Sequence, residues 1–239
     1  MLIWEPNLRG VPISNPPQAQ REPSQAAATP PRARGVPYSG TIIFIGASTG
    51  GTEAIREVLT RLPADVPPIL MTQHMPEMFT ASFAHRLNLL SKVNVKEAAQ
   101  GEMIEPGMAY LAPGHSHLRI KKMHAGGYQC ELSRSDPVNH HRPSVDVLFH
   151  SAAEQVGHAA IGVILTGMGK DGAVGLLRMM QAGAWTIGQD QDTCVVYGMP
   201  REAALLGALK EVVPITEVAA RVLQRLGGGF HSHAEYPRV

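Results

Sequence analysis

The chain has 239 residues, of which 44% are hydrophobic and 17% charged, a composition ordinary for a globular protein that buries a sizeable core. Its 21 Lys and Arg nearly balance its 20 Asp and Glu, so net charge predicts no attraction to nucleic acid or anionic lipid. A secretory signal and a membrane-spanning run are both missing from the sequence, and Cys130 and Cys194 are too far apart for a metal-type pair. We therefore expect a cytoplasmic protein.

The sequence divides into three parts by composition. Residues 1–39 hold eight of the nineteen prolines and no periodic apolar face, which predicts a proline-rich disordered leader. Residues 40–226 carry the regular apolar patterns of a folded domain. Residues 227–239, rich in glycine and histidine, are expected to form a flexible tail.

Within 40–226, short apolar runs alternate with segments of helical spacing. A buried strand at 41–46 precedes a helix at 52–62, and this alternation of strand and helix continues to residue 226. The other predicted strands are 67–74, 109–114, 117–123, 128–132, 159–167, 184–189 and 211–215. The other predicted helices are 79–90, 144–157 with Ser144 as N-cap, 173–183, 201–209 and 217–226.

This alternation predicts an α/β fold: a doubly wound, mostly parallel sheet with helices on both faces. The run "HLRIKKMHAGGYQCEL" is the exception, because two strands are separated only by a turn at Gly126 and Gly127. We expect an antiparallel hairpin there, inserted at one edge of the sheet.

Ligands of such sheets bind at the carboxyl ends of the strands, near a switch in strand order. Three predicted strands end in polar loops, "ASTGG", "HMP" and "MGKDGA", which bring Ser48, His74 and Asp171 to one rim if the strands are neighbours.

The segment from Gly46 to Gly50 satisfies G-x-S-x-G between a strand and a helix, as a nucleophile elbow requires. A serine on a sharp turn exposes its hydroxyl, and the following helix N-terminus offers free N–H groups to a developing oxyanion. The same turn could instead bind phosphate, or simply connect a strand to a helix, and the pattern alone leaves all three open.

A nucleophilic serine needs a base and a carboxylate that orients it. Of eleven histidines, His74 is preferred because it follows a strand directly. Asp171 is the preferred carboxylate, and its alternatives are a helix-capping role and a rival pair in another loop, Asp190 and Asp192. The H-x-H pair His115 and His117 lacks supporting ligands, so we predict neither a metal nor a cofactor.

Six stretches resemble, in the family's order, the catalytic domain of chemotaxis protein-glutamate methylesterases of the CheB type. They are "IGASTGG", "TQHMP", "YLAPG", "HRPSVDVLF", "GVILTGMGKDGA" and "QDQDTCVVYGMP". The resemblance implies Ser48 as nucleophile, His74 as base and Asp171 as orienting carboxylate. It also implies the backbone N–H groups of Thr49 and Met168 as oxyanion donors.

The activity that the resemblance implies is hydrolysis of γ-glutamyl methyl esters on chemoreceptors, with deamidation of receptor glutamines. The implied partners are the receptors' cytoplasmic helices. The family usually carries a receiver domain before the catalytic one, and residues 1–39 are too short for it. A stand-alone esterase and a truncated chain both remain open, and a separate receiver or signalling protein is a further candidate partner. Two other classes remain open: a phosphate- or nucleotide-binding module using the Gly50-Gly51 turn, and a non-catalytic receptor adaptor.

Overall fold

The computed structural model describes residues 40–227. The predicted leader, and all of the predicted tail except Gly227, lie outside the described residues. None of the helices in the described part is long and apolar enough to cross a membrane.

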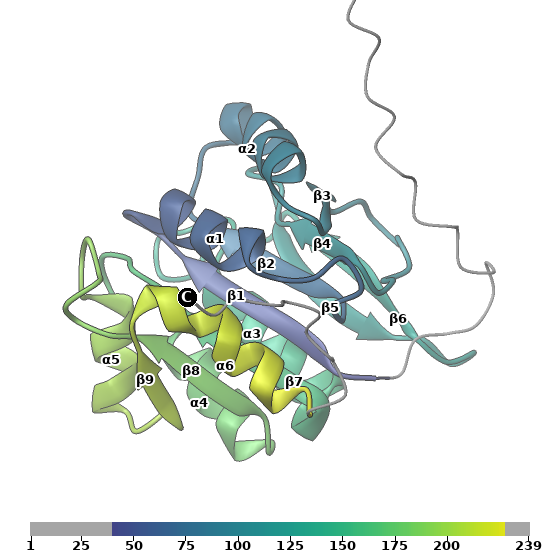
Figure 1. Ribbon diagram of the computed structural model, residues 1–239. Coiled ribbons are helices and arrows are strands. Elements are labelled where there is room, and N and C mark those ends of the chain that lie inside the picture. The colour runs from purple at the N-terminus through teal and green to yellow at the C-terminus, as the bar shows by residue number, and fades with distance from the viewer. Residues whose placement is uncertain (1–39, 228–239) are drawn as a thin grey trace, which may run out of the picture. The chain divides into compact units, whose positions relative to one another are not determined.

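The described residues form a seven-stranded parallel sheet of order β3-β4-β2-β1-β7-β8-β9 (Figure 1). Its strands are β1 (Ile42–Ala47), β2 (Ile69–Gln73), β3 (Asn94–Glu97), β4 (Met108–Leu111), β7 (Ala160–Ile164), β8 (Trp185–Gln189) and β9 (Glu211–Val213). All six residues of β1 are buried, because this strand is central and covered on both faces. The chain first builds the β2 side of β1 and then crosses to β7, so the switch in strand order lies between β1 and β7.

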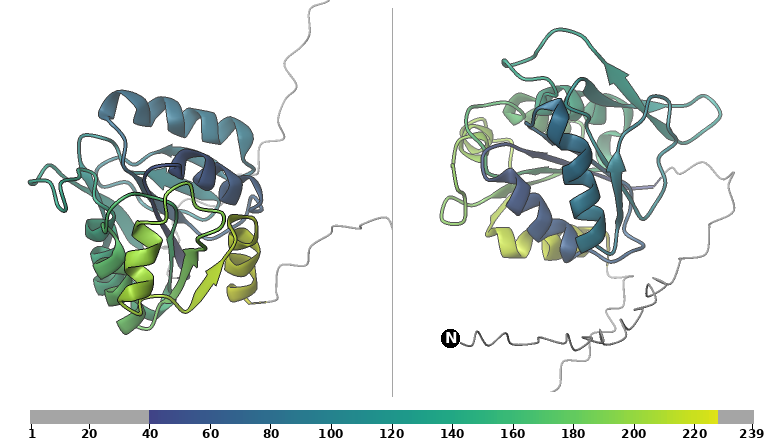
Figure 2. Two further views of the ribbon diagram at one scale, coloured as in Figure 1. Left: turned by 90° about the vertical axis from the view of Figure 1, so that its left-hand side faces the viewer. Right: turned by 90° about the horizontal axis from the view of Figure 1, so that it is seen from above.

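In the described part of the chain, six α-helices cover the two faces of the sheet (Figure 2). On one face lie α1 (Gly51–Thr60), α2 (Glu77–Leu90) and α6 (Ile215–Arg225), and on the other α3 (Val145–Gln155), α4 (Ala173–Gln181) and α5 (Met199–Leu205). A short 3-10 turn, Gly157–Ala159, precedes β7. Each face has its own apolar cluster, divided by the alternation of β1: Ile43 and Ile45 face α1, whereas Ile42 and Phe44 face α3. The predicted fold class is confirmed.

The predicted hairpin is confirmed as β5 (His117–Lys122) and β6 (Tyr128–Ser133), with Gly126 and Gly127 at positive φ in its turn. It forms a separate two-stranded sheet instead of extending an edge of the large one. Its apolar side packs on α3, where Ile120 N donates to Ser151 Oγ at 3.0 Å. Burying that side against a helix keeps the hairpin away from the sheet edge.

The edge strand β3 has no counterpart among the predicted elements. Only Val95 of its four residues is buried, so it lacks the apolar run by which the other strands were recognised. Its pairing with β4 is a tertiary feature.

Candidate active site

Ser48 lies directly after β1, on the turn that leads into α1. Its N–H donates to Thr166 O at 3.0 Å, and Gly51 N donates back to Ser48 O at 2.7 Å. Gly50 has a φ of 79°, the left-handed conformation that favours glycine. A Cβ on Gly46 would lie 2.2 Å from Val145 Cγ1, so the first glycine of the motif is needed for α3 to pack against β1.

His74 follows β2 and is held beside the serine turn. His74 N donates to Ala47 O at 3.1 Å, and the side-chain amide of Gln73 donates to both Ser48 O and His74 O. The imidazole is 7% exposed, and its Nε2 lies 2.7 Å from Asp171 Oδ2. Two loops that are neighbours in the sheet thus lie side by side, as parallel pairing of β1 and β2 requires.

Asp171 is almost fully buried between β7 and α4, and its carboxylate accepts hydrogen bonds from five donors. They are His74 Nε2 (2.7 Å), Asn139 Nδ2 (2.8 Å), Ser144 Oγ (2.7 Å), Val145 N (2.6 Å) and Asp146 N (3.2 Å). Burial by itself would raise the pKa of Asp171, but the hydrogen bonds outweigh it and lower the pKa to about 2. The group is therefore an ionised acceptor at neutral pH.

The ionised carboxylate fixes the tautomer of His74. Because Asp171 can only accept, His74 Nε2 must donate, and in the neutral ring Nδ1 then carries the lone pair. His74 Nδ1 is buried and has no hydrogen-bond partner among the described residues. It is the nitrogen available to take a proton from a hydroxyl.

Ser48 Oγ makes no hydrogen bond within residues 40–227, so the structure places Ser48 next to the His74 loop without a Ser48–His74 bond. Catalytic hydrogen bonds are often long in unliganded sites and shorten when substrate binds.

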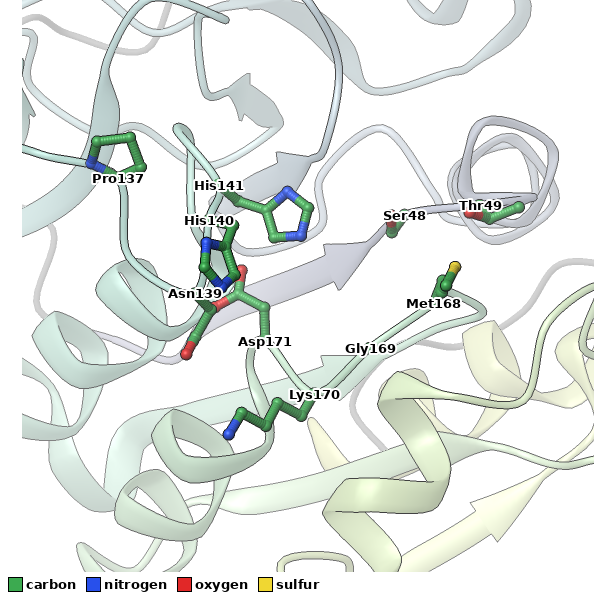
Figure 3. Close-up of a pocket in the computed structure, with 10 residues that line it drawn as sticks. All are labelled: Ser48, Thr49, Pro137, Asn139, His140, His141, Met168, Gly169, Lys170 and Asp171. Carbon is green, nitrogen blue, oxygen red and sulfur yellow. The ribbon is translucent and has the colours of Figure 1, made fainter.

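A pocket of about 730 Å³ opens over this rim, with Ser48, Thr49 and Met168 on one side and His140 and His141 on the other (Figure 3). Its lining residues are Ser48, Thr49, Pro137, Asn139, His140, His141, Met168, Gly169, Lys170 and Asp171. Among the described residues, the backbone N–H groups of Thr49 and Met168 donate to no other group, so both are free for a ligand oxygen. The Met168 side chain is 70% exposed.

The loop before α3 contributes side chains to the site that were not predicted from the sequence. Asn139 Nδ2 donates to Asp171 and also to Asp146 Oδ2, and the ring of His141 stacks on His74. Ser144 is the predicted N-cap and accepts from Val147 N, but its hydroxyl also donates to Asp171. The available signal was the polar run "NHHRPS" directly before a predicted helix.

The alternative candidate residues lie outside the pocket that Ser48 lines and have structural roles. Asp190 accepts from Thr193 N and Thr193 Oγ1 within its own turn. His117 of the H-x-H pair is fully buried, with Nδ1 accepting from Ser144 N and Nε2 lying 3.1 Å from Asp136 O. Its ring is held inside the fold by the start of α3.

These features define a class: an α/β protein with a serine, a histidine–aspartate pair and free N–H groups around one pocket at the switch point of the sheet. The chain belongs to the CheB methylesterase family, whose model matches residues 43–222. It is similar to the crystal structure of the Thermotoga maritima CheB methylesterase catalytic domain, with a TM-score of 0.77 and 40% sequence identity, over 79% of this chain and 100% of that one.

Two bacterial relatives are named protein-glutamate methylesterase/protein-glutamine glutaminase. The Nitrosomonas europaea protein is 61% identical over 83% of this chain and 55% of its own length. The Dechloromonas aromatica protein, numbered 1 in its organism, is 62% identical over 84% of this chain and 58% of its own length. The chain thus spans somewhat more than half the length of these relatives.

Proposed function

We propose that this chain is a serine hydrolase that removes methyl groups from γ-glutamyl methyl esters of chemoreceptors and, more slowly, deamidates receptor glutamines. The observation that carries the proposal is the hydrogen-bonded pair of His74 and Asp171, beside the pocket that Ser48 lines. Membership of the CheB methylesterase family and the names of the relatives support the substrate class.

In the proposed reaction, Ser48 Oγ attacks the ester carbonyl carbon while its proton passes to His74 Nδ1. Asp171, already ionised, stabilises the imidazolium through Nε2 without taking its proton. The N–H groups of Thr49 and Met168 are the proposed donors to the oxyanion, since both are free and border the pocket.

Collapse of the tetrahedral intermediate releases methanol, which takes the proton from His74, and leaves a glutamyl ester on Ser48. Water then attacks this ester with His74 again acting as base, and the products are the receptor glutamate and free Ser48. A glutamine substrate follows the same path and releases ammonia. We expect the amide to react more slowly unless the receptor orients its leaving nitrogen.

The proposed partners are the cytoplasmic helices of chemoreceptors, which places the reaction in the cytoplasm. A separate receiver or signalling protein is a second proposed partner. The nucleotide-binding alternative at the Gly50-Gly51 turn is not favoured by the family match. A non-catalytic receptor adaptor would bind the same helices but would release no methanol.

The test is methanol release from receptor-containing membranes that carry isotope-labelled methyl esters. Wild type is compared with Ser48→Ala and with Ser82→Ala, a matched control whose hydroxyl lies on the exposed side of α2. The proposal predicts release by wild type and Ser82→Ala, and a loss of roughly 10⁴- to 10⁶-fold in Ser48→Ala. Equal release by wild type and Ser48→Ala would rule out the serine mechanism. Receptor binding with no release by wild type would favour the adaptor.

A further inference from the structure

His141 lies face to face with His74, although the two residues come from different loops. The ring centroids are 3.7 Å apart and the ring planes differ by 12°. His141 lines the pocket that Ser48 also lines, and Figure 3 shows its ring on the side opposite Ser48. A stack this close covers one face of the His74 imidazole.

The loop that presents His141 is a tight two-residue turn. Val138 N donates to His141 O and His141 N donates to Val138 O, both at 3.0 Å. The two residues between them, Asn139 and His140, have φ values of 53° and 67°. Positive φ at both central positions is the type I′ geometry, which favours asparagine and glycine and is strained for His140.

The turn is anchored to the carboxylate that His74 binds. Asn139 Nδ2 donates to Asp171 Oδ1 at 2.8 Å and to Asp146 Oδ2 at 2.7 Å. The same four-residue turn therefore contacts both members of the His74–Asp171 pair, through an amide on the carboxylate and a ring on the imidazole. Its strained backbone is maintained by contacts that fix these two side chains.

We propose that His141 is a positioning residue, whose ring holds the plane of the His74 ring so that Nε2 stays on Asp171 and Nδ1 stays free to take the Ser48 proton. The inference rests on the proposed function, because it assigns His141 a part in the same reaction. Within residues 40–227 the His74 ring has a single hydrogen bond, at Nε2, so no hydrogen bond holds its Nδ1 edge.

Charge explains why the stacking residue should be neutral. His74 becomes an imidazolium in the proposed reaction, and the face of a neutral aromatic ring attracts a cation whereas a second cation repels it. The charged or titratable groups around His141 are His74, Asp171 and Lys170 from other loops and His140 in its own turn. Burial lowers the pKa of His141, His74 and His140 lower it further, and Asp171 raises it only partly, so the ring is neutral at pH 7.

The kinetic test uses the methanol-release assay with His141→Ala, His141→Phe and the control His85→Ala, which removes an exposed histidine of α2. We expect His141→Ala to lower kcat by roughly 10- to 100-fold with KM within about threefold, since small misplacements of reacting groups have effects of this size. His141→Phe restores the flat neutral face and should recover most of kcat.

Three kinetic results would overturn the inference. An unchanged kcat in His141→Ala would show that the stack is dispensable. A His141→Phe variant as inactive as His141→Ala would make His141 a proton carrier in its own right. A raised KM with unchanged kcat would make it a substrate contact.

A matched pair covers the case in which His141→Ala fails to fold. Lys and Met have similar length, so His141→Lys and His141→Met differ mainly in charge. We expect kcat of the Lys variant to be at least about tenfold below that of the Met variant, because the added cation opposes imidazolium formation. Equal kcat values would overturn the inference.

A readout without substrate separates this inference from the proposed function. The Nε2 proton of His74, hydrogen-bonded to Asp171, should give a protected low-field NMR signal in wild type and His141→Phe, and should be broadened by exchange in His141→Ala. If wild type released no methanol but the NMR signals followed this pattern, only the proposed methylesterase function would be overturned. A signal that persists unchanged in His141→Ala would overturn the positioning role.

Discussion

Asp171→Asn tests the role of the Asp171 carboxylate, whose five hydrogen-bond partners are all donors. Three of them face Oδ1 and two face Oδ2. An asparagine offers one acceptor oxygen and one NH₂ group, so in either orientation at least two buried donors lose their acceptor. Each unsatisfied buried donor costs about 1–3 kcal/mol, which gives a loss of roughly 2–6 kcal/mol in the free energy of unfolding.

The same replacement disturbs the base. If the amide NH₂ faces His74 Nε2, that nitrogen can no longer donate, and the lone pair moves from Nδ1 to Nε2. A tautomer error of this kind lowers kcat by roughly 10⁴-fold in a serine hydrolase. We therefore expect Asp171→Asn to lose most methanol release while still folding in the absence of denaturant.

Methanol release and urea denaturation, measured on the same preparations, test both parts of this prediction. The matched control is Asp190→Asn, which removes a carboxylate that only closes its own turn with Thr193, and its turnover should stay within about threefold of wild type. The assignment of the carboxylate would be refuted if Asp171→Asn kept more than a tenth of wild-type turnover. It would also be refuted if Asp190→Asn lost as much turnover as Asp171→Asn.

Three further predictions concern stability. The pKa of Asp171 falls on folding from 3.8 to about 2. The ionised carboxylate therefore adds about 2 kcal/mol to the free energy of unfolding above pH 4, and this contribution is lost as the pH drops towards 2. The free energies of unfolding of wild type and Asp171→Asn should converge over that pH range. Gly46→Ala should cost roughly 1–3 kcal/mol in urea denaturation, because its Cβ would overlap Val145, and an unchanged midpoint would contradict this. Asn139→Gly removes the amide that bridges two carboxylates, and should lower the free energy of unfolding by roughly 1–3 kcal/mol. His140→Gly only relieves a positive φ, so it should leave the stability unchanged or raise it slightly. Equal losses of stability in the two variants, measured by calorimetry, would contradict this prediction.

The parts of the fold that were predictable are those with short-range signals. The apolar run of β1, the glycines around Ser48 and the helical spacing of α1 lie within twenty residues and all favour a strand, a sharp turn and a helix. Parallel pairing then brings the loops after β1, β2 and β7 to one rim, which is why residues as distant as His74 and Asp171 could be chosen together.

The remaining features depend on tertiary contacts that no local pattern encodes. Asn139 reaches Asp171 across 32 positions of sequence, and its left-handed backbone is followed by a histidine where a glycine would have signalled the turn. The stack of His141 on His74 requires two loops to meet face to face. The docking of the hairpin on α3 and the polar edge strand β3 follow from packing in the same way.

Labelling by a serine-reactive fluorophosphonate, followed by peptide mapping, tests most directly whether Ser48 is a nucleophile activated by His74. We predict one labelled site in the native chain, at Ser48, and loss of that label in His74→Ala while the variant remains folded. Methanol release from receptors without any label at Ser48, or equal labelling of His74→Ala, would contradict the account.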